Sequence, residues 1–380
     1  MKIVVCTDSF KGSLTSAQAG NLMIKGLRRV FPEAEYRLIP MADGGEGTAP
    51  ALTQALGGRM ETARVHGPLG KEVEADVGFL PDGSAVMDMA SASGLTLVAS
   101  NELDPMRADT FGTGELIRYA LDMHCRRIYL GIGGSATNDG GSGMARALGA
   151  RFLDEKGREL PPGGGALKNL SRVDCSGLDQ RLRETSIEVM CDVDNPLCGP
   201  EGASFVYGPQ KGATPDMVHA LDAALDHYQR VLARQTGLDL AGKPGAGAAG
   251  GLGYGLMIFA KARLCPGVDT LLKLSRFDEL MAQCDLVVTG EGRIDGQSAH
   301  GKTPCGVARA AARHSVPAIA IGGSLGEGAE ALYGLGVSGL ESCVRQVMPL
   351  DQALARVDEL LPQAAERAGR MLLTGRKMHF

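Results

Sequence analysis

The sequence predicts an α/β protein made of two α/β domains, with a doubly wound, mostly parallel sheet in the first. Three observations lead to this fold class. The chain has 380 residues, and one hydrophobic core rarely serves more than about 250–300 residues. Short β-branched runs alternate with helical spacing of apolar residues, which is typical of parallel sheets covered by helices. A stretch from about residue 61 to 110 breaks this alternation.

The first elements follow the alternating pattern. KIVVCTD, residues 2–8, predicts a strand that ends in a polar loop, and residues 13–30 carry apolar side chains at helical spacing. Thr15 and Gln18 form the pattern of a capping box, and Pro32 closes the helix. YRLIPMA and TAPALTQAL, residues 36–42 and 48–56, repeat the strand and helix order.

The next segment reads as hairpins, because residues 63–89 are short extended pieces separated by Gly-Pro, Leu-Gly and Asp-Gly turns. Strand and helix patterns then return in three later stretches: RRIYLGIG with GSGMARALGA (126–150), CDLVVTG with TPCGVARAAARH (284–314) and VPAIAIGG (316–323). We therefore expect a discontinuous first domain, residues 1–62 plus 278–380, and an inserted mixed α/β domain, residues 63–277.

Composition narrows the class of protein. The formal net charge is −5, and no basic run is interleaved with aromatic residues, which argues against a nucleic-acid partner. No stretch approaches the about 18 apolar residues of a membrane span, and the apolar run before Asp8 is too short for a secretory signal. Nine cysteines without a CxxC pair suit reduced thiols. We expect a cytoplasmic protein without a membrane partner.

Five loops, in which small residues surround acidic, amide or basic side chains, suggest chemistry. Each follows or contains a predicted strand end: DSFKGS (8–13), ADGGEGT (42–48), GGSATNDGG (133–141), CDVDNP (191–196) and GEGRIDGQSAHGKT (290–303). Ligands of open α/β sheets bind at the carboxyl ends of the strands. Glycine lets backbone N–H groups approach an anion, and carboxylates in such a place require a cation.

These loops supply candidates for each role in phosphoryl transfer. Asp43 and Asp192 are candidate catalytic residues, one as the base and the other as a magnesium ligand together with Asp194, and Lys11 would neutralise a phosphoryl group. Asp192 and Asp194 share one face if their segment is extended. The alternative is that these aspartates only form turns. Candidates for binding substrate or phosphate are Asp8, Ser9, Glu46, Ser135, Asn138, Asp139, Asn195, Lys211, Glu291, Arg293, Asp295 and Lys302.

Two glycine motifs need separate weighing. GQSAHGKT, residues 296–303, matches the phosphate-loop pattern, yet the preceding strand is expected to end several residues earlier. Because Pro304 follows, Thr303 is expected to cap a helix, while Lys302 remains a phosphate candidate. GAGAAG, residues 245–250, fits a dinucleotide fingerprint but follows no strand, so we do not predict a nicotinamide cofactor.

Taken together and in order, the motifs resemble those of the type-1 bacterial glycerate kinases, which make 2-phosphoglycerate. The stretches that carry the resemblance are DSFKGSLTS, PMADGGEGT, GIGGSATNDGGSGM, CDVDNPLCGPEGA, GPQKGA and TGEGRIDGQSAHGKTPCGVA. The resemblance implies ATP-dependent, magnesium-assisted phosphorylation of (R)-glycerate, in glucarate, galactarate or glyoxylate breakdown. It also implies two α/β domains, one of them Rossmann-like.

Other functions stay open at this stage. The chain could phosphorylate a related hydroxy acid or sugar acid, or glycerate at its 3-hydroxyl. A non-catalytic protein that binds a small ligand is a different class, but simple capture of an anion would not need so many carboxylates. The expected partners are glycerate and ATP, and a homo-oligomer is compatible with the sequence.

Overall fold

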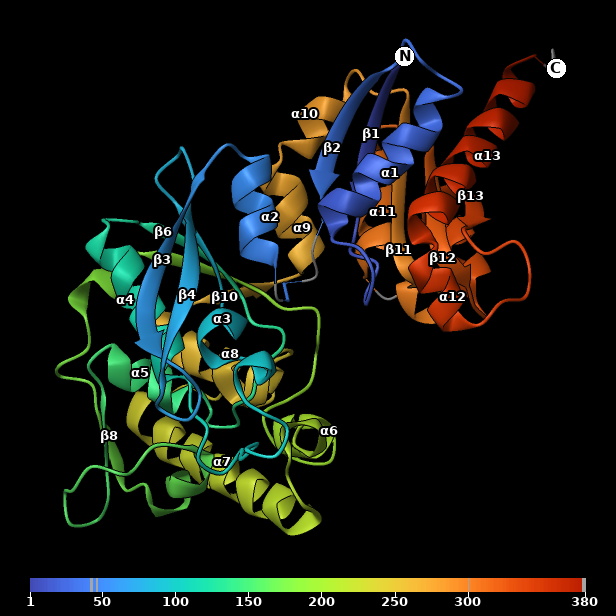
Figure 1. Ribbon diagram of the computed structural model, residues 1–380. Helices are drawn as coiled ribbons and strands as arrows, with labels where there is room; N and C mark the ends of the chain where they lie inside the picture. The colour runs from blue at the N-terminus through green and yellow to red at the C-terminus, as the bar shows by residue number, and fades with distance from the viewer. Residues whose placement is uncertain (42–43, 46, 300, 378–380) are drawn as a thin grey trace. The chain divides into compact units, whose positions relative to one another are not determined.

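The computed structural model describes residues 1–41, 44–45, 47–299 and 301–377 (Figure 1). The chain divides into two compact units: Met1–Asp43 with Val268–Phe380, and Gly44–Gly267. Each unit has its own hydrophobic core. Asp43 and Glu46, two of the predicted site residues, lie outside the described residues.

The first unit is built on a parallel five-stranded sheet of order β13-β12-β11-β1-β2. Its strands are β1 (Lys2–Thr7), β2 (Glu35–Pro40), β11 (Leu286–Ile294), β12 (Ala318–Leu325) and β13 (Val337–Ser342). Its helices are α1 (Ser16–Arg28), α9 (Gly267–Leu274, which begins at the unit boundary), α10 (Phe277–Met281), α11 (Thr303–Arg313), α12 (Leu350–Ala355) and α13 (Val357–Lys377).

Helices cover both faces of this sheet, as the alternation predicts. Ile3 and Val5 of β1 are fully buried in a core that includes side chains of α1 and α13. The intervening residues of β1 point to the opposite face, and α11 packs against β11 and β12. The doubly wound arrangement is confirmed.

The capping box predicted at the start of α1 is present. The Thr15 hydroxyl accepts the Gln18 N–H at 3.2 Å, and the Thr15 N–H donates to Gln18 Oε1 at 2.9 Å. These two bonds satisfy backbone donors that the first helical turn leaves open. The sequence pattern therefore fixes where the helix begins.

The second unit is mixed α/β. Its main sheet has the order β10-β9-β6-β5-β4-β3, with β3, β4 and β5 antiparallel and β5, β6, β9 and β10 parallel. The strands are β3 (Arg59–His66), β4 (Glu72–Phe79), β5 (Ala85–Asp88), β6 (Arg127–Gly131), β9 (Ser186–Met190) and β10 (Arg263–Cys265), while β7 (Arg151–Leu153) and β8 (Arg172–Asp174) form a separate pair. The hairpins expected after residue 61 are confirmed.

Helices of two kinds surround this sheet. The α-helices are α2 (Thr48–Ala55), α3 (Ala90–Ser93), α4 (Phe111–Asp122), α5 (Ser142–Ala147), α6 (Ala203–Tyr207), α7 (Pro215–Thr236) and α8 (Ala248–Ala260). The 3₁₀ turns of this unit are η1 (Leu95–Leu97), η2 (Gly164–Asn169), η3 (Gln180–Arg183) and η4 (Pro209–Lys211), and the first unit adds η5 (Gly296–Ala299) and η6 (Ala329–Leu335).

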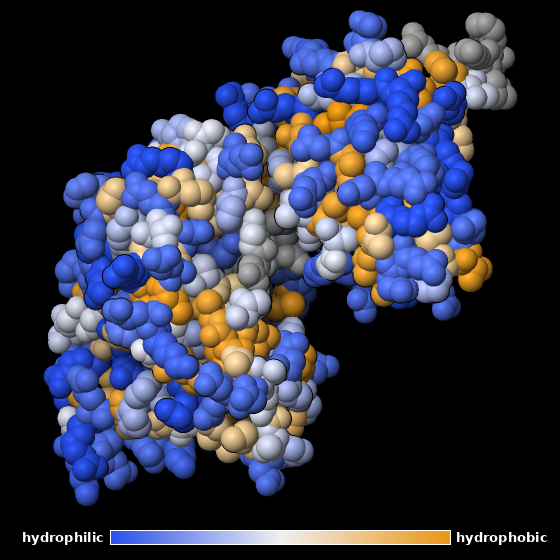
Figure 2. Space-filling view, viewed as in Figure 1, coloured by the Kyte–Doolittle hydropathy of each residue, from blue (hydrophilic) through white to orange (hydrophobic). Residues whose placement is uncertain are grey.

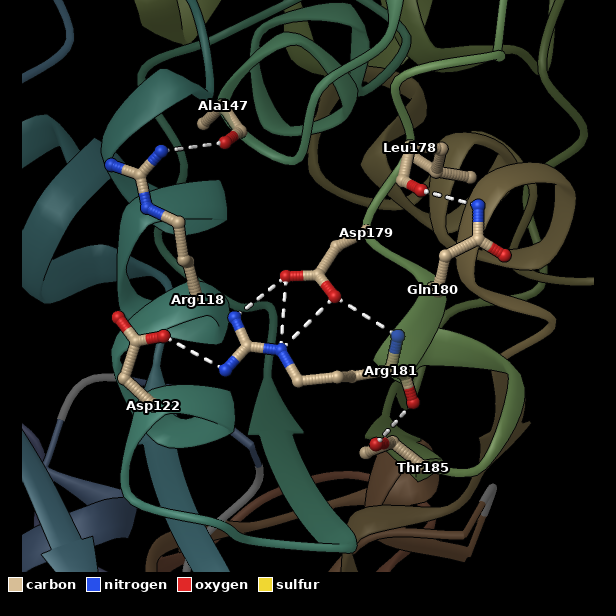
Figure 3. A network of polar contacts seen from close by, with 8 residues as sticks. All are labelled: Arg118, Asp122, Ala147, Leu178, Asp179, Gln180, Arg181 and Thr185. Carbon is tan, nitrogen blue, oxygen red and sulfur yellow. Dashed lines mark hydrogen bonds and ion pairs between the residues drawn. The ribbon is translucent and has the colours of Figure 1, made fainter.

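Arg181 holds η3 against α4 through a surface network (Figure 3). Its guanidinium pairs with Asp179 Oδ2 at 2.7 Å and with Asp122 Oδ1 at 2.8 Å, and its side chain is 44% exposed. Exposed ion pairs contribute about 0–1 kcal/mol to stability. We therefore assign this network to local structure and not to a site.

The limits of the two compact units differ from the domain boundaries that the sequence suggests. The helix α2 packs on β3, β4 and β5 and belongs to the second unit, as does the whole of β3. At the other end the change falls after Gly267 instead of residue 277. Whether these units are domains that fold independently stays a prediction.

Two local expectations were wrong. The strand β11 does not end before GEGR but continues to Ile294, because Glu291, Arg293 and Ile294 pair with β12. Thr303 does not cap α11: the N-cap is Lys302, and Thr303 is the first helical residue. Its hydroxyl donates instead to Asp8, as described below.

The surface is mostly hydrophilic on the face shown in Figure 2, where hydrophobic residues lie in separate groups. Among the described residues, no helix combines the length and the apolar character that crossing a membrane requires.

Candidate active site

In the first unit, Asp8 stands at the carboxyl end of β1 and is 7% exposed. Its backbone N–H donates to Gly290 O of β11 at 2.9 Å. Its carboxylate accepts the Ser9 N–H at 2.6 Å and the Thr303 hydroxyl at 3.3 Å. The end of β1 is thereby joined to the start of α11.

Glu291 lies beside this junction, on β11, and is 8% exposed. Its Oε1 accepts a hydrogen bond from the hydroxyl of Ser298. Burial raises the pKa of Glu291, while the Ser298 hydrogen bond and the charges of Lys302 and Lys11 lower it. Both lysines therefore act on the same buried carboxylate, although they come from loops far apart in the sequence.

Asp295 and Arg293, in contrast, are engaged with each other. Arg293 Nε lies 3.2 Å from Asp295 Oδ2, and the Arg293 side chain is 69% exposed. Asp295 Oδ1 also accepts the Gln297 N–H at 3.0 Å, in the turn after β11. The structure therefore places this pair next to Glu291 in the chain, but its charges largely satisfy each other.

In the second unit, the loop GGSATNDGG follows β6 and is organised around Asp139, which is fully buried. Its carboxylate accepts N–H groups of Thr110, Gly141 and Gly143 at 3.1, 3.2 and 2.8 Å, and the Thr110 hydroxyl at 2.8 Å. The Gly141 amide, which belongs to a loop that the sequence suggested for an anion, is thus occupied by a side chain of that loop.

Lys211 enters the same loop from η4 and is 1% exposed. Its ammonium group donates to Ser135 Oγ at 2.7 Å and to Thr137 O at 2.6 Å. Burial lowers the pKa of Lys211 to about 7, against the opposing charge of Asp139. Asn138, also fully buried, donates from Nδ2 to Ser204 Oγ at 2.9 Å.

Asp88 and Asp109 are buried carboxylates of this unit that the sequence analysis did not identify. Asp88 ends β5 and accepts the N–H groups of Gly47 and Ala49 at 2.9 and 3.1 Å, so it caps α2 from another element. Asp109 accepts the Phe111 N–H at 3.1 Å, and burial, followed by the charge of Asp139, raises its pKa to about 6. An acidic residue at the end of an apolar run, as in AVMD, was the signal for Asp88.

The segment CDVDNP lies beyond β9, which ends at Met190. Asp192 is exposed and its Oδ1 accepts the Gly267 N–H at 2.8 Å. Asp194 is also exposed, and Asn195 is held by Glu201 O at 2.7 Å and the Tyr207 hydroxyl at 2.6 Å. The segment is not a strand, so strand alternation does not place the two carboxylates on one face.

The carboxylate oxygens of Asp192 and Asp194 suit magnesium, which prefers oxygen ligands and keeps several waters. Among the described residues, no three His, Cys, Asp or Glu side chains form a metal-sized group. Since magnesium is often bound through only one or two carboxylates, the two exposed aspartates fit such a site. Their role as ligands stays a prediction.

The fingerprint-like GAGAAG stretch has a packing role. Gly140 N–H donates to Gly250 O at 3.0 Å, and a Cβ on Gly250 would lie 2.0 Å from Thr137 O. The glycines of this stretch therefore allow the start of α8 to approach the loop after β6.

Known proteins match this chain over its whole length. The sequence profile of the glycerate kinase family matches residues 3–373. The chain belongs to the glycerate kinase family. A glycerate kinase of Halalkalibacterium halodurans is 51% identical over 96% of both chains. The glycerate 2-kinase of Escherichia coli K12 is 44% identical over 99% of both chains.

A solved structure extends the comparison to the fold. The crystal structure assigned to a glycerate kinase 2 of Salmonella typhimurium LT2 has a TM-score of 0.89 and 44% identity, with all of both chains covered. Membership of the glycerate kinase family makes this chain a phosphotransferase with an alcohol acceptor. The α/β fold class and the family resemblance are confirmed.

Proposed function

We propose that this member of the glycerate kinase family transfers the γ-phosphoryl group of ATP to the 2-hydroxyl of (R)-glycerate, with magnesium, giving 2-phosphoglycerate and ADP. The observation that carries the proposal is the buried carboxylate Glu291 with Lys11 and Lys302 acting on it, at the carboxyl end of a parallel strand. Ligands of such sheets bind there. Full-length similarity to proteins named glycerate kinase supports the substrate.

We assign each residue a role in the reaction from the chemistry of its side chain. Lys11 and Lys302 would neutralise phosphoryl oxygens, because phosphoryl transfer is catalysed mainly by positioning and charge stabilisation. One of Asp43 and Asp192 would accept the hydroxyl proton of glycerate. The other, with Asp194, would hold magnesium, which neutralises charge on the ATP phosphates. Asp8, Ser9, Glu46, Ser135, Asn138, Asp139, Asn195, Glu291, Arg293 and Asp295 remain proposed binding residues.

The first experiment tests the reaction. The purified chain is expected to phosphorylate D-glycerate with ATP and magnesium, to lose turnover in excess chelator, and to give 2-phosphoglycerate by carbon-resolved NMR. A panel of related hydroxy acids and sugar acids tests the alternative substrates, and a 3-phosphate product would correct the regiochemistry. Equal turnover with and without chelator would refute the role of the cation.

A second experiment separates base from metal ligand. Asp43→Asn and Asp192→Asn are nearly isosteric, and each is measured for turnover and for ATP binding as magnesium is titrated. Loss of the base should abolish turnover and spare magnesium-dependent nucleotide binding, whereas loss of a ligand should raise the magnesium requirement. Glu155→Gln, on an exposed turn of the second unit, is the control. Parent-like turnover in both variants would move these roles to Glu291 and Asp295.

The same proposal places the enzyme in the cytoplasm, with glycerate and ATP as its partners. It would serve catabolism of glucarate, galactarate or glyoxylate. Its oligomeric state is open to measurement by light scattering.

A further inference from the structure

The ammonium group of Lys211 determines how the hydroxyl of Ser135 can be used. An ammonium group has hydrogen-bond donors and no acceptor. In the 2.7 Å contact between Lys211 Nζ and Ser135 Oγ, the serine oxygen must therefore accept. While the Lys211 amine is protonated, below its lowered pKa of about 7, the Ser135 hydrogen has to point to some other acceptor.

No acceptor for that hydrogen lies within hydrogen-bond distance among the residues that the structure describes. Ser135 is nevertheless 6% exposed and belongs to a loop that is otherwise well bonded. A nearly buried hydroxyl without an acceptor is unusual, because a buried polar group that makes no hydrogen bond costs about 1–3 kcal/mol of stability. The hydroxyl therefore needs an acceptor that comes from outside the described chain.

The backbone fixes Ser135 on both sides. Gly134 O accepts the Leu95 N–H at 2.9 Å, and the Ala136 N–H donates to Ser93 O at 2.9 Å. The serine follows β6, which lies between β5 and β9 in the parallel part of the sheet. It therefore stands at the carboxyl ends of parallel strands, which is the ligand-binding end of such a sheet.

Charge decides the kind of acceptor. A hydroxyl whose oxygen accepts from a cation is polarised, and a polarised donor binds an anionic oxygen most strongly. The nearby negative charge of Asp139 is already taken up by the N–H groups and hydroxyl that it accepts. The balance around Ser135 therefore favours an anion.

We propose that Ser135 donates a hydrogen bond to an anionic oxygen of a substrate, and that Lys211 is the positioning residue that forces the Ser135 hydroxyl to donate. The inference rests on the proposed function, in which two substrates carry such oxygens: the carboxylate of glycerate and the phosphates of ATP. Lys211 is assigned this indirect role because its side chain is only 1% exposed and two of its three N–H donors are used inside the loop, by Ser135 Oγ and Thr137 O.

Ser135→Ala is the central test. It removes one hydroxyl from a loop whose backbone bonds remain, so the variant is expected to fold. Because the buried Lys211 ammonium loses one acceptor, a loss of about 1–3 kcal/mol of stability is expected, and binding is measured well below the melting temperature. Its dissociation constant for one substrate, measured separately for glycerate and for ATP by calorimetry, should rise about ten- to a hundredfold, the loss expected for a charge-assisted hydrogen bond. A rise for glycerate identifies the carboxylate, and a rise for ATP identifies a phosphate.

Ser93→Ala is the matched control. Ser93 is fully buried in the same unit, and its hydroxyl bonds to Thr113 Oγ1 at 2.8 Å. Its carbonyl, which the substitution keeps, accepts the Ala136 N–H of the Ser135 loop. This variant should leave both dissociation constants within about twofold of the parent. An unchanged affinity for both substrates in Ser135→Ala would overturn the proposal.

Lys211→Met tests the positioning role through a double-mutant cycle. If Lys211 acts through Ser135, the variant with both changes should bind the affected substrate no more weakly than the worse single variant, because residues that act as a unit are not additive. If the fold losses of affinity in the two single variants multiply in the double variant, Lys211 acts separately from Ser135, and its assigned role is overturned. Should Lys211→Met fail to fold, Ser135→Ala and its control still decide whether the hydroxyl binds a substrate.

The failure of the proposed function would look different. A parent chain that binds glycerate and ATP but does not turn them over would refute the kinase activity and leave the Ser135 affinities measurable. If the parent is active and Ser135→Ala binds glycerate and ATP as tightly as the parent, only the inference about this serine is refuted.

Discussion

At the scale of single residues, buried charge in the second unit is balanced unevenly. Asp139 accepts bonds from three backbone amides and two hydroxyls. Asp109, whose pKa is affected by the charge of Asp139, accepts the N–H of Phe111. A buried carboxylate is costly to ionise unless it accepts several hydrogen bonds. Asp109 is therefore the carboxylate that is harder to ionise. Its raised pKa, about 6, expresses this difference.

Asp109→Asn is therefore expected to stabilise the protein at neutral pH. With a folded-state pKa of about 6 against an ordinary 3.8, the folded state holds the Asp109 proton where the unfolded state has lost it. Stability contributed by this group is thus lost as pH rises from about 4 to 6, and asparagine does not titrate. The free energy of unfolding at pH 8 should rise by up to about 3 kcal/mol, with the gain vanishing below pH 4.

Urea titrations of both proteins from pH 3.5 to 8 measure this gain. Asp82→Asn is the control of opposite sign, because hydrogen bonds from Ser84 lower the pKa of Asp82. That variant should lose stability at neutral pH. A stability difference for Asp109→Asn that does not change with pH would show that its cause is not ionisation.

The residue scale also shows what the sequence could predict of the site. It identified Asp8, Lys11, Glu291 and Lys302, which the structure brings together, because each follows or belongs to a strand next to glycine. It could not show that Asp139 accepts the N–H groups of Thr110, Gly141 and Gly143, since Thr110 is 29 residues away. Asp88 and Asp109 were missed for the same reason, as their partners lie on other elements or in an unrecognised turn.

At the scale of elements, local signals predicted the start of α1 and the hairpins, but not the length of β11. The capping box of Thr15 and Gln18 is complete within four residues. The extension of β11 depends on pairing with β12, about 30 residues later, and its glycines and charges do not resemble a strand. Thr303 looked like a cap because Pro304 follows, yet a partner 295 residues away, Asp8, holds its hydroxyl.

Gly250→Ala tests the close approach of α8 to the loop after β6. Residue 250 has φ +67, and an added Cβ would lie 2.0 Å from Thr137 O and 2.6 Å from Asn138 Cα. Backbone strain of about 1–2 kcal/mol and a clash with backbone that cannot rotate away should together lower the free energy of unfolding by at least about 3 kcal/mol. Denaturant unfolding of the full chain measures the loss.

Gly157→Ala separates strain from clash. Gly157 has φ +74 but no atom within 4 Å of the added Cβ. Its substitution should therefore cost only the strain, about 1–2 kcal/mol. Equal losses in the two variants would contradict the packing role assigned to the GAGAAG stretch.

At the scale of the whole molecule, the two compact units have different relations to the chain. The second unit is one continuous segment, Gly44–Gly267, and the first is assembled from both ends of the chain. The described cores share no residue between the units. Sequence patterns predict domain boundaries where strands change character. The compact units change at Gly44 instead, and α2 packs on β4 and β5 of the second unit.

Expression of two fragments tests where the inserted unit begins and ends. Residues 44–267 contain the whole six-stranded sheet, α2 and its cap on Asp88, so this fragment should be monodisperse and unfold cooperatively in denaturant. Residues 63–277 would lose α2 and the first half of β3, which exposes the edge of β4 and the apolar surface that α2 covers. Because an uncovered strand edge promotes aggregation, this shorter fragment should aggregate or lack a cooperative transition. Cooperative unfolding of residues 63–277 with the same midpoint would instead place the boundary at residue 62, since α2 would then add nothing to the stability of the unit.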